Sequence, residues 1–316
     1  MTDIRVEPYT FQHKRIWDEM IAHSRNGVFL FFRDYMEYHS NRFQDASLLF
    51  FDEHDLLAVL PANRNGNQVV SHGGLTFGGV ISQYNLGASA MLEVFDILRE
   101  WLRGQGVSTL LYKPVPHIYH RMPAEEDLYA LFRLGARLVR RDLSSTLDMA
   151  CRSPMHHGRE SQLRRGKRTF VVRESRDFAA FMDLVSAGLT TKYNVAPTHT
   201  REEIELLAGR FPQNIRVFGA YRGGQLCAGV LVYENTNVAH TQYIAGTDEA
   251  KREGALECVF NELLERRYAS IRYFDWGIST EQSGRYLNAG LVQNKESYGA
   301  RGVVYDLYEL DLARTK

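Results

Sequence analysis

The chain has 316 residues, which is long for a single hydrophobic core and enough for two domains of roughly 150 residues each. Its composition, with 44% hydrophobic and 24% charged residues, is typical of a soluble globular protein. Thirty-eight basic side chains balance 38 acidic ones, so the formal net charge is zero. This balance argues against a large nonspecific nucleic-acid surface, although it leaves room for a local basic patch.

Cysteine usage and hydropathy predict a cytoplasmic protein. The three cysteines, Cys151, Cys227 and Cys258, have neither paired nor metal-type spacing, which is typical of reduced thiols. No apolar run approaches the roughly 18 residues of a membrane helix, and the first residues lack the pattern of a signal peptide. We expect any membrane contact to be peripheral. We expect no metal site, because no His, Cys or Asp cluster has ligand spacing.

The first half of the chain predicts helices, a three-strand meander, a long helix and closing strands. A strand at 4–6 precedes helical stretches at 11–24 and 32–43. The meander strands are 47–52, 56–61 and 68–71, and a glycine-rich segment, 73–79, follows them. The remaining expected elements are helix 88–103, strand 107–113, helix 128–134 and strand 140–149.

The second half repeats this order, which predicts a duplicated unit with a boundary near 150–155. The expected helices are 160–165, 177–190, 202–209 and 249–268. The expected strands are 170–173, 216–221, 226–234, 238–245, 271–275 and 303–310. A short polar helix at 281–287 is expected between the last two strands.

Residues 273–301, YFDWGISTEQSGRYLNAGLVQNKESYGAR, contain the main candidate chemistry. Asp275 falls where the buried strand is expected to end, and Gly277 lets the backbone leave that strand steeply. Lys295 follows in the segment beyond. Loops at the carboxyl ends of strands form the crevice of α/β proteins, so a carboxylate and a lysine placed there predict a functional site.

Within this stretch, the order D-W-G-I-S, G-R-Y-L-N-x-G-L and K-E-x-Y-G resembles the D-F-G…F-K-x-x-F-G pattern of FemAB-like proteins. These are tandem-GNAT acyltransferases related to the peptidoglycan aminoacyltransferases, and the likeness is closest to a soluble branch often linked to surface polysaccharides. The segments 71–79, SHGGLTFGG, and 197–200, PTHT, support the resemblance, as does Phe211-Pro212.

The resemblance implies an α/β (α+β) fold of two tandem GNAT-like domains. Each would be a mixed, mostly antiparallel sheet flanked by helices. Residues 1–152 would form the acceptor-binding half, and residues 153–316 the acyl-donor and catalytic half.

An acyltransferase must hold an activated donor beside an amine, remove a proton and stabilise the oxyanion. Two interpretations of Asp275 stay open: a base or amine-orienting group, or the cap of a helix starting near Ser279. The resemblance implies that Lys295 polarises the acyl carbonyl or binds a phosphate, whereas a Lys-Glu pair is more often solvated. Glu296 either contacts substrate or pairs with a basic neighbour.

Three further side chains are candidates near the same cleft. Tyr298 is a general acid for the leaving thiolate or an ordinary packing residue. His199 is a base, or it is exposed beside Thr200 as the cap of the next helix. Tyr193 and Asn194, just upstream, would line the cleft.

Polar residues on strands and glycine-rich turns predict substrate contacts. His240 and Gln242 alternate with apolar residues on strand 238–245, so both are expected on one face, where a satisfied core network is the alternative for His240. In the first half, glycine-rich backbone before a helix can cradle phosphates. The resemblance implies that His72 and Thr76 contact a nucleotide-sugar acceptor there.

GNAT enzymes hold the coenzyme A pyrophosphate on backbone amides at a helix start, with the pattern Q/R-x-x-G-x-G/A. The corresponding residues here are Lys251, Arg252 and Gly254, a version with one glycine. This departure from the pattern leaves an aminoacyl-tRNA or carrier-bound donor open. We expect no tightly bound cofactor, and acyl-CoA or another thioester as the co-substrate. The basic segment 159–168 either binds donor phosphates or is a solvated helix face.

The predicted function is transfer of an acyl group to the amine of a nucleotide-linked amino sugar or a similar cell-surface polysaccharide precursor. One alternative is an aminoacyl-tRNA-dependent aminoacyltransferase acting on a cell-wall precursor, which would make nucleic acid a partner. The long coiled-coil arm of several such enzymes is missing, since no heptad run of three repeats occurs. The other alternative is a degenerate GNAT pair that binds a ligand without catalysis.

Overall fold

The computed structural model describes residues 4–313, and these form two compact units. Unit 1 is the chain up to Asp142 together with Thr280–Tyr286 and the residues from Val304 onward. Unit 2 consists of Leu143–Ser279 and Leu287–Val303.

These units differ from the contiguous halves, 1–152 and 153–316, that the sequence led us to expect. Each unit takes a short piece from the other half of the chain. The physical reason is that two of the unit boundaries fall inside long strands, β9 (Arg137–Asp148) and β17 (Arg301–Asp311), and not in a linker.

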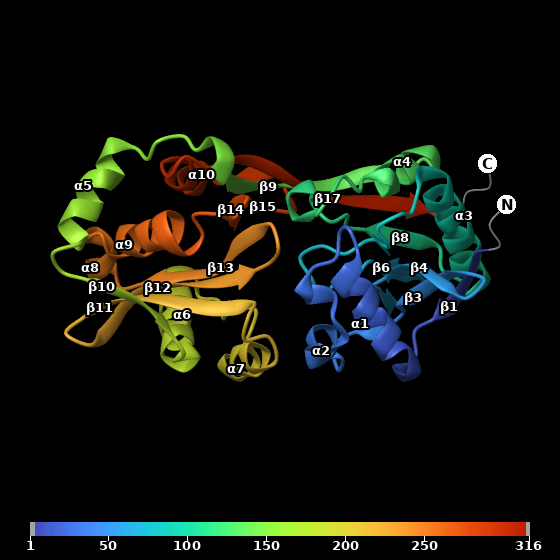
Figure 1. The fold of residues 1–316 in the computed structure, drawn as a ribbon, viewed down its shortest axis with the longest axis horizontal. Coiled ribbons are helices and arrows are strands. Elements are labelled where there is room, and N and C mark those ends of the chain that lie inside the picture. Colours follow the sequence, from blue (N-terminus) through green and yellow to red (C-terminus); the bar gives the residue numbers. More distant parts are fainter. Residues whose placement is uncertain (1–3, 314–316) are drawn as a thin grey trace. The chain divides into compact units, whose positions relative to one another are not determined.

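In unit 1, helices lie on both faces of the strands (Figure 1). Its strands form two sets, in the orders β1-β3-β4-β7 and β17-β8-β6-β5-β2. The expected three-strand meander is divided between these sets, because Pro61 has no N–H with which to continue the ladder after β4. The strands are β1 (Ile4–Pro8), β2 (Gln44–Asp45), β3 (Leu48–Asp52), β4 (Asp55–Leu60), β5 (Asn63–Asn65), β6 (Gln68–Val70), β7 (Ile81–Ser82) and β8 (Thr109–Tyr112).

Helix α3 (Ala88–Gly104) packs on the core of unit 1 through one apolar stripe. The helical stretch expected at 32–43 is shorter in the structure, where α2 (Arg33–Met36) gives way to a 3₁₀ turn. The buried residues of α3 lie along one helical face, each with another three or four positions away: Met91, Val94, Phe95, Leu98 and Leu102. The other helices of unit 1 are α1 (Lys14–His23) and α4 (Glu126–Arg133).

Unit 2 is built on strands in the order β10-β11-β12-β13-β14-β9. The pair β13–β14 is parallel, and the other neighbours in this series are antiparallel. Helices α5 and α9 lie on one face and α6 and α7 on the other (Figure 1). The strands are β10 (Val171–Ser175), β11 (Ile215–Arg222), β12 (Gln225–Glu234), β13 (Val238–Gly246) and β14 (Tyr273–Ile278). The helices are α5 (His157–Gly166), α6 (Phe178–Tyr193), α7 (Arg201–Arg210), α8 (Asp248–Arg252), α9 (Ala255–Glu262) and α10 (Ala289–Glu296).

Aromatic packing fixes the orientation of β14. The rings of Phe274 and Trp276 lie 6.2 and 5.6 Å from that of Phe260 on α9. Because side chains alternate along a strand, Asp275 points to the opposite face, the one covered by α6 and α7. This alternation separates an apolar side of β14 from a polar side.

Two expected helices take another form. Residues 281–287 belong to a hairpin of β15 (Thr280–Glu281) and β16 (Tyr286–Leu287), whose turn contains left-handed Gln282, Ser283 and Gly284, a backbone that an α-helix excludes. The helix expected at 249–268 is interrupted at Gly254, where φ is +90°. Within residues 4–313, no helix is both long enough and apolar enough to cross a membrane.

Candidate active site

Strands β13 and β14 separate in the middle of unit 2. They pair in parallel over only three positions, from Val238 with Tyr273 to His240 with Asp275. Both strands continue, β13 to Gly246 and β14 to Ile278. At the same point the register of β14 against β9 shifts, so β14 turns away from β13. Beyond His240 the edge of β13 is not paired with β14, and an unpaired strand edge is suited to an extended ligand.

Asp275 lies where the two strands separate and is fully buried. One carboxylate oxygen accepts hydrogen bonds from Ser144 Oγ at 2.6 Å and Thr146 Oγ1 at 2.7 Å, both on β9. The other lies 2.7 Å from Nδ1 of His240. Burial raises the pKa of Asp275, but the hydrogen bonds from His240, Ser144 and Thr146 outweigh it and hold that pKa below its ordinary value.

The ionised Asp275 fixes the orientation of His240. Because a carboxylate only accepts hydrogen bonds, Nδ1 of His240 must be the donor, and the neutral ring then carries its lone pair on Nε2. The His240 side chain is 15% exposed, so the ring reaches the surface. It lies over Gly277, where an added Cβ would be 3.2 Å from the ring. Sequence reasoning placed these residues in one cleft but did not pair them.

A β-bulge changes which neighbours His240 has. Leu231 pairs with Tyr243, but Val232 pairs with Thr241, so Gln242 is an extra residue without a partner on β12. The Gln242 side chain is hydrogen-bonded to the Tyr243 hydroxyl, so the expectation that His240 and Gln242 share a face stays a prediction. The bulge brings Tyr243 to the same face as His240, and regular alternation gave no signal for this residue.

His199 is hydrogen-bonded to Tyr243 on this face of β13. The backbone N–H of His199 donates to the Tyr243 hydroxyl at 3.1 Å, and its ring Nδ1 is 2.9 Å from the same oxygen. His199 is 5% exposed, whereas the alternative interpretation had it exposed. Thr200 is nevertheless the N-cap of α7, as that interpretation also held.

Lys295 is held against the end of β14. It sits in the last turn of α10, not in a loop, and is 4% exposed. Its Nζ donates to Gly277 O at 2.7 Å, Ile278 O at 2.8 Å and Ser279 Oγ at 2.8 Å. Burial lowers the pKa of Lys295 to about 8, against the opposing pull of Asp275. An ammonium has three N–H groups, and all three are used.

Residues 152–286 match a family model described as an acetyltransferase (GNAT) domain. The fold of the whole chain is similar to that of FemX, with a TM-score of 0.68 and 10% identity over 97% of both chains. It is also similar to the C-terminal domain of a putative lysylphosphatidylglycerol synthetase from Agrobacterium fabrum, with a TM-score of 0.61 and 12% identity over 95% of this chain and 92% of that one. A tandem GNAT protein from the clavulanic acid biosynthesis pathway aligns over 99% of this chain and all of its own, 100%, with a TM-score of 0.51 and 10% identity. The comparison with curated proteins gave no match.

The chain contains a GNAT acetyltransferase domain, and its fold is that of FemX and of a tandem GNAT protein. The likenesses to solved structures establish its fold, and the matched GNAT domain supplies the class of activity. The predicted fold class, a mixed and mostly antiparallel sheet flanked by helices, is confirmed.

In this GNAT protein, Tyr298 and Glu296 lie apart from the Asp275–His240 pair. Tyr298 is 3% exposed and stacks on Trp276 at 5.7 Å, on the α9 side of β14. Its hydroxyl donates to Glu257 at 3.2 Å, and burial raises its pKa well above the ordinary value. Glu296 is exposed. The geometry therefore gives Tyr298 a packing position.

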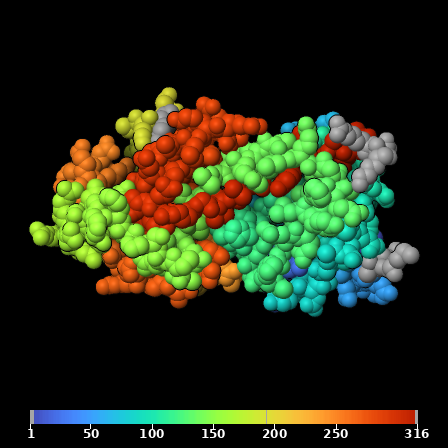
Figure 2. All heavy atoms as spheres, turned by 90° about the horizontal axis from the view of Figure 1, so that it is seen from above, coloured from blue at the N-terminus to red at the C-terminus, as the bar shows by residue number. Residues whose placement is uncertain are grey.

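The segment that was expected to bind the coenzyme A pyrophosphate is covered by helix α5. An added Cβ on Gly254 would lie 2.2 Å from Gln162 O, so α5 rests directly on the start of α9. Figure 2 shows α5 in yellow-green beside the orange-red α10 on one face of unit 2, where Arg159 donates to Ser297 at 2.9 Å. Lys251 and Arg252 are exposed on α8.

The remaining predicted residues lie elsewhere. In unit 1, the His72 ring packs 5.3 Å from that of His39, and burial, with His39 and Lys113, lowers the His72 pKa to about 3. Thr76 is exposed on the same glycine-rich loop. Asn194, at the end of α6, is exposed and left-handed, with φ +53°. The Tyr193 side chain falls outside the described part of the chain.

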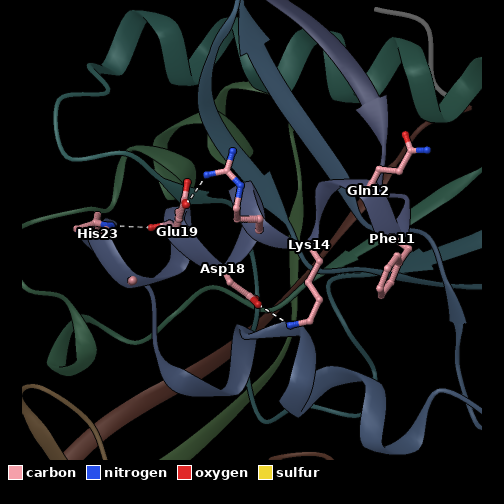
Figure 3. A pocket seen from close by; sticks show the side chains of 8 residues that line it. Phe11, Gln12, Lys14, Asp18, Glu19 and His23 are labelled. Carbon is pink, nitrogen blue, oxygen red and sulfur yellow. Dashed lines mark hydrogen bonds and ion pairs between the residues drawn. The ribbon is translucent and has the colours of Figure 1, made fainter.

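A shallow cavity of about 720 Å³ in unit 1 follows helix α1 (Figure 3). Its charged side chains are already paired, Lys14 with Asp18 at 2.7 Å and Arg15 with Glu19 at 2.7 Å. His23 also lines the cavity, with its Nδ1 2.9 Å from Glu19 O, and the rest of the lining is mainly aliphatic stems and the ring of Phe11.

Proposed function

We propose that unit 2 transfers an acyl group from a thioester to an amine, with His240 as the general base and Asp275 as its orienting carboxylate. The observation that carries this proposal is the Asp275–His240 hydrogen bond at the point where β13 and β14 separate. The separated edge of β13 offers backbone groups to an extended acyl donor, and His240 Nε2 lies beside that edge.

The proposed reaction starts with a neutral His240. The amine attacks the thioester carbonyl carbon while Nε2 accepts an N–H proton, and Asp275 stabilises the resulting imidazolium. The tetrahedral intermediate expels the thiolate, or the ribose oxygen where the donor is an aminoacyl-tRNA ester, and His240 returns the proton to this leaving group. The products are an amide and the free thiol or uncharged tRNA, and His240 ends as it began.

In this proposal Lys295 positions the end of β14. Its three N–H groups are bonded to residues 277–279, so it has no free donor for a substrate carbonyl. By fixing the backbone beneath the His240 ring, it keeps Nε2 at the site. His199 and Tyr243 support the same face of β13.

For the substrates, we propose an amine of a nucleotide-linked amino sugar or a related cell-envelope precursor as the acceptor, held largely by the N-terminal half with His72 and Thr76. Acyl-CoA is one donor. A second donor, aminoacyl-tRNA, is favoured by the covering of Gly254, because α5 occupies the space where a pyrophosphate would meet the start of α9. We propose a cytoplasmic location for the protein with either donor.

The test is turnover of purified protein with acyl-CoA and amino-sugar nucleotides, followed as free thiol, in parallel with charged tRNA and the same acceptors, followed as amide product. Replacing His240 by Ala should lower kcat by at least about 100-fold, the contribution of a general base. His157→Ala is the matched control, because that side chain is in the same unit and 96% exposed. Normal turnover by His240→Ala would exclude His240 as the base.

The two donors are distinguished by treatment with ribonuclease, which abolishes transfer from aminoacyl-tRNA and leaves transfer from acyl-CoA unchanged. Lack of product from every thioester and every charged tRNA, with ligand binding intact, would favour the non-catalytic interpretation.

A further inference from the structure

Another cavity lies in unit 2, near the residues where β13 and β14 begin. The two strands separate further along, after His240 and Asp275. The volume of this cavity is about 460 Å³, within the range of small-molecule sites. It is formed where β12 ends, where β13 begins, and where the segment after α9 leads into β14. Glu234, in its wall, pairs with Ala239, the residue before His240, so the side chains of Glu234 and His240 lie on opposite faces of the sheet. The cavity is therefore separate from the proposed acyl-transfer site.

The lining of this cavity is rich in planar polar groups. Five of its side chains end in a carboxylate, a carboxamide or a guanidinium: Gln213, Asn214, Glu234, Asn235 and Arg267. Each such group presents two polar atoms in one plane and can bind two neighbouring hydroxyls at once. This composition matches a ligand with vicinal hydroxyls.

The charges around the cavity cancel. Glu234 accepts hydrogen bonds from Arg267 at 2.8 Å and from the Tyr268 hydroxyl at 3.2 Å. Arg216 lies 3.4 Å from the same carboxylate and is also bonded to Glu174 at 2.7 Å. Two guanidinium groups thus face two carboxylates, and a ligand with a net charge gains no advantage. The balanced charges around the cavity therefore favour a neutral ligand.

One acceptor in the cavity wall has no partner. Within the described residues, Asn235 Oδ1 is buried and makes no hydrogen bond. Its backbone is fixed, since Asn235 N–H donates to Val238 O at 2.8 Å. A buried unpaired acceptor is unfavourable, so a ligand hydroxyl that donates to it stabilises the complex. A π-helical turn, Leu263–Arg267, delivers Arg267 to the site, and such turns are frequent at functional sites.

We propose that this cavity binds a neutral polyhydroxyl compound of monosaccharide size, with Asn235 Oδ1 and the Arg267–Glu234 pair contacting neighbouring hydroxyls. The binding is independent of acyl transfer and is tested without an activity assay.

The experiment is saturation-transfer NMR and calorimetry on the full chain with D-glucose, D-mannose and D-galactose, and with sulfate and L-glutamate as charged competitors. At least one sugar should bind saturably. Asn235→Leu and Arg267→Met should each weaken it by at least tenfold, whereas Asn235→Asp, which keeps the oxygen acceptor, should retain it. Gln225→Ala, on the turn between β11 and β12, is the control and should bind normally.

Three results would overturn the proposal. They are lack of saturable binding by every sugar, unchanged affinity in folded Asn235→Leu and Arg267→Met, and displacement of the sugar by sulfate or L-glutamate at equal or lower concentration. Thermal unfolding of each variant separates a lost ligand contact from a lost fold.

Discussion

Asp275 illustrates how one residue serves both fold and site. Its three hydrogen-bond donors come from β9 and β13, on both sides of β14. We expect Asp275→Asn to lower kcat by at least about 100-fold, because an amide no longer holds His240 in the tautomer with a free Nε2. Steady-state kinetics should show this loss while the far-UV circular dichroism stays unchanged.

Asp55→Asn, on the exposed turn between β3 and β4, is the control and should retain full activity. A kcat within threefold of wild type for Asp275→Asn would show that the carboxylate does not act through His240.

Lys295 should contribute strongly to stability. Lys295→Met keeps the aliphatic stem but leaves Gly277 O, Ile278 O and Ser279 Oγ without their donor. With about 1–3 kcal/mol for each buried group left unpaired, we expect the free energy of unfolding to fall by about 3 kcal/mol or more. Urea denaturation measures this free energy of unfolding. Lys167→Met, at an exposed lysine, is the control, and its free energy of unfolding should be within about 0.5 kcal/mol of wild type.

The lowered pKa of Lys295 predicts that the stability of the protein depends on pH. Burial lowers the pKa of Lys295 to about 8 in the folded state from an ordinary 10.5. Between these values the unfolded chain binds one more proton than the folded chain, so stability rises with pH. The difference in unfolding free energy between wild type and Lys295→Met should therefore grow as the pH increases from about 8 towards 10.5. A difference that is flat or shrinking over this window would contradict the burial of a charged amine.

At the scale of elements, the bend at Gly277 separates β14 from β13. Its φ of +76° is costly for a residue with a side chain, and an added Cβ would press on the His240 ring at 3.2 Å. We expect Gly277→Ala to destabilise the protein by about 1–2 kcal/mol and to lower kcat at least tenfold by displacing the ring. Thermal unfolding and kinetics measure the two effects.

Gly188→Ala is a matched control, because Gly188 lies in helix α6 with open space around its Cβ position. This change should leave activity unchanged and stabilise the protein by up to about 1 kcal/mol. Equal behaviour of the two alanine variants would argue against a role for the bend.

At the scale of the whole molecule, the last strand completes the unit that begins the chain. Leu310 and Leu312 lie in the core of unit 1 with Phe50 and Phe95. Leu310→Ala should reduce the stability of unit 1 by about 2–5 kcal/mol, although this residue is 200 positions beyond Leu110, its partner on β8 (310 − 110).

Hydrogen exchange locates this effect. Amides of β3 and β4 should exchange faster in Leu310→Ala, whereas those of β11 and β12 should change less. Exposed Leu287→Ala, at 46% exposure, is the control. Faster exchange confined to unit 2 would contradict the division into these units.

Local patterns in the sequence determined the tandem order of elements, the apolar stripe of α3, the strand carrying Asp275 and the GNAT class. These features depend on spacings of two, three or four residues, which a chain displays before it folds. The sequence also singled out Asp275, His240, His199 and Lys295 as chemically important.

Only the tertiary structure decided how these residues meet. The bond between His240 and Asp275 joins positions 35 apart, and its existence depends on the register of two strands. The bulge at Gln242 brought Tyr243 to the face of His240, and packing buried Lys295 against backbone that no motif identifies. Strand register and burial result from contacts between distant segments, so local periodicity does not contain them.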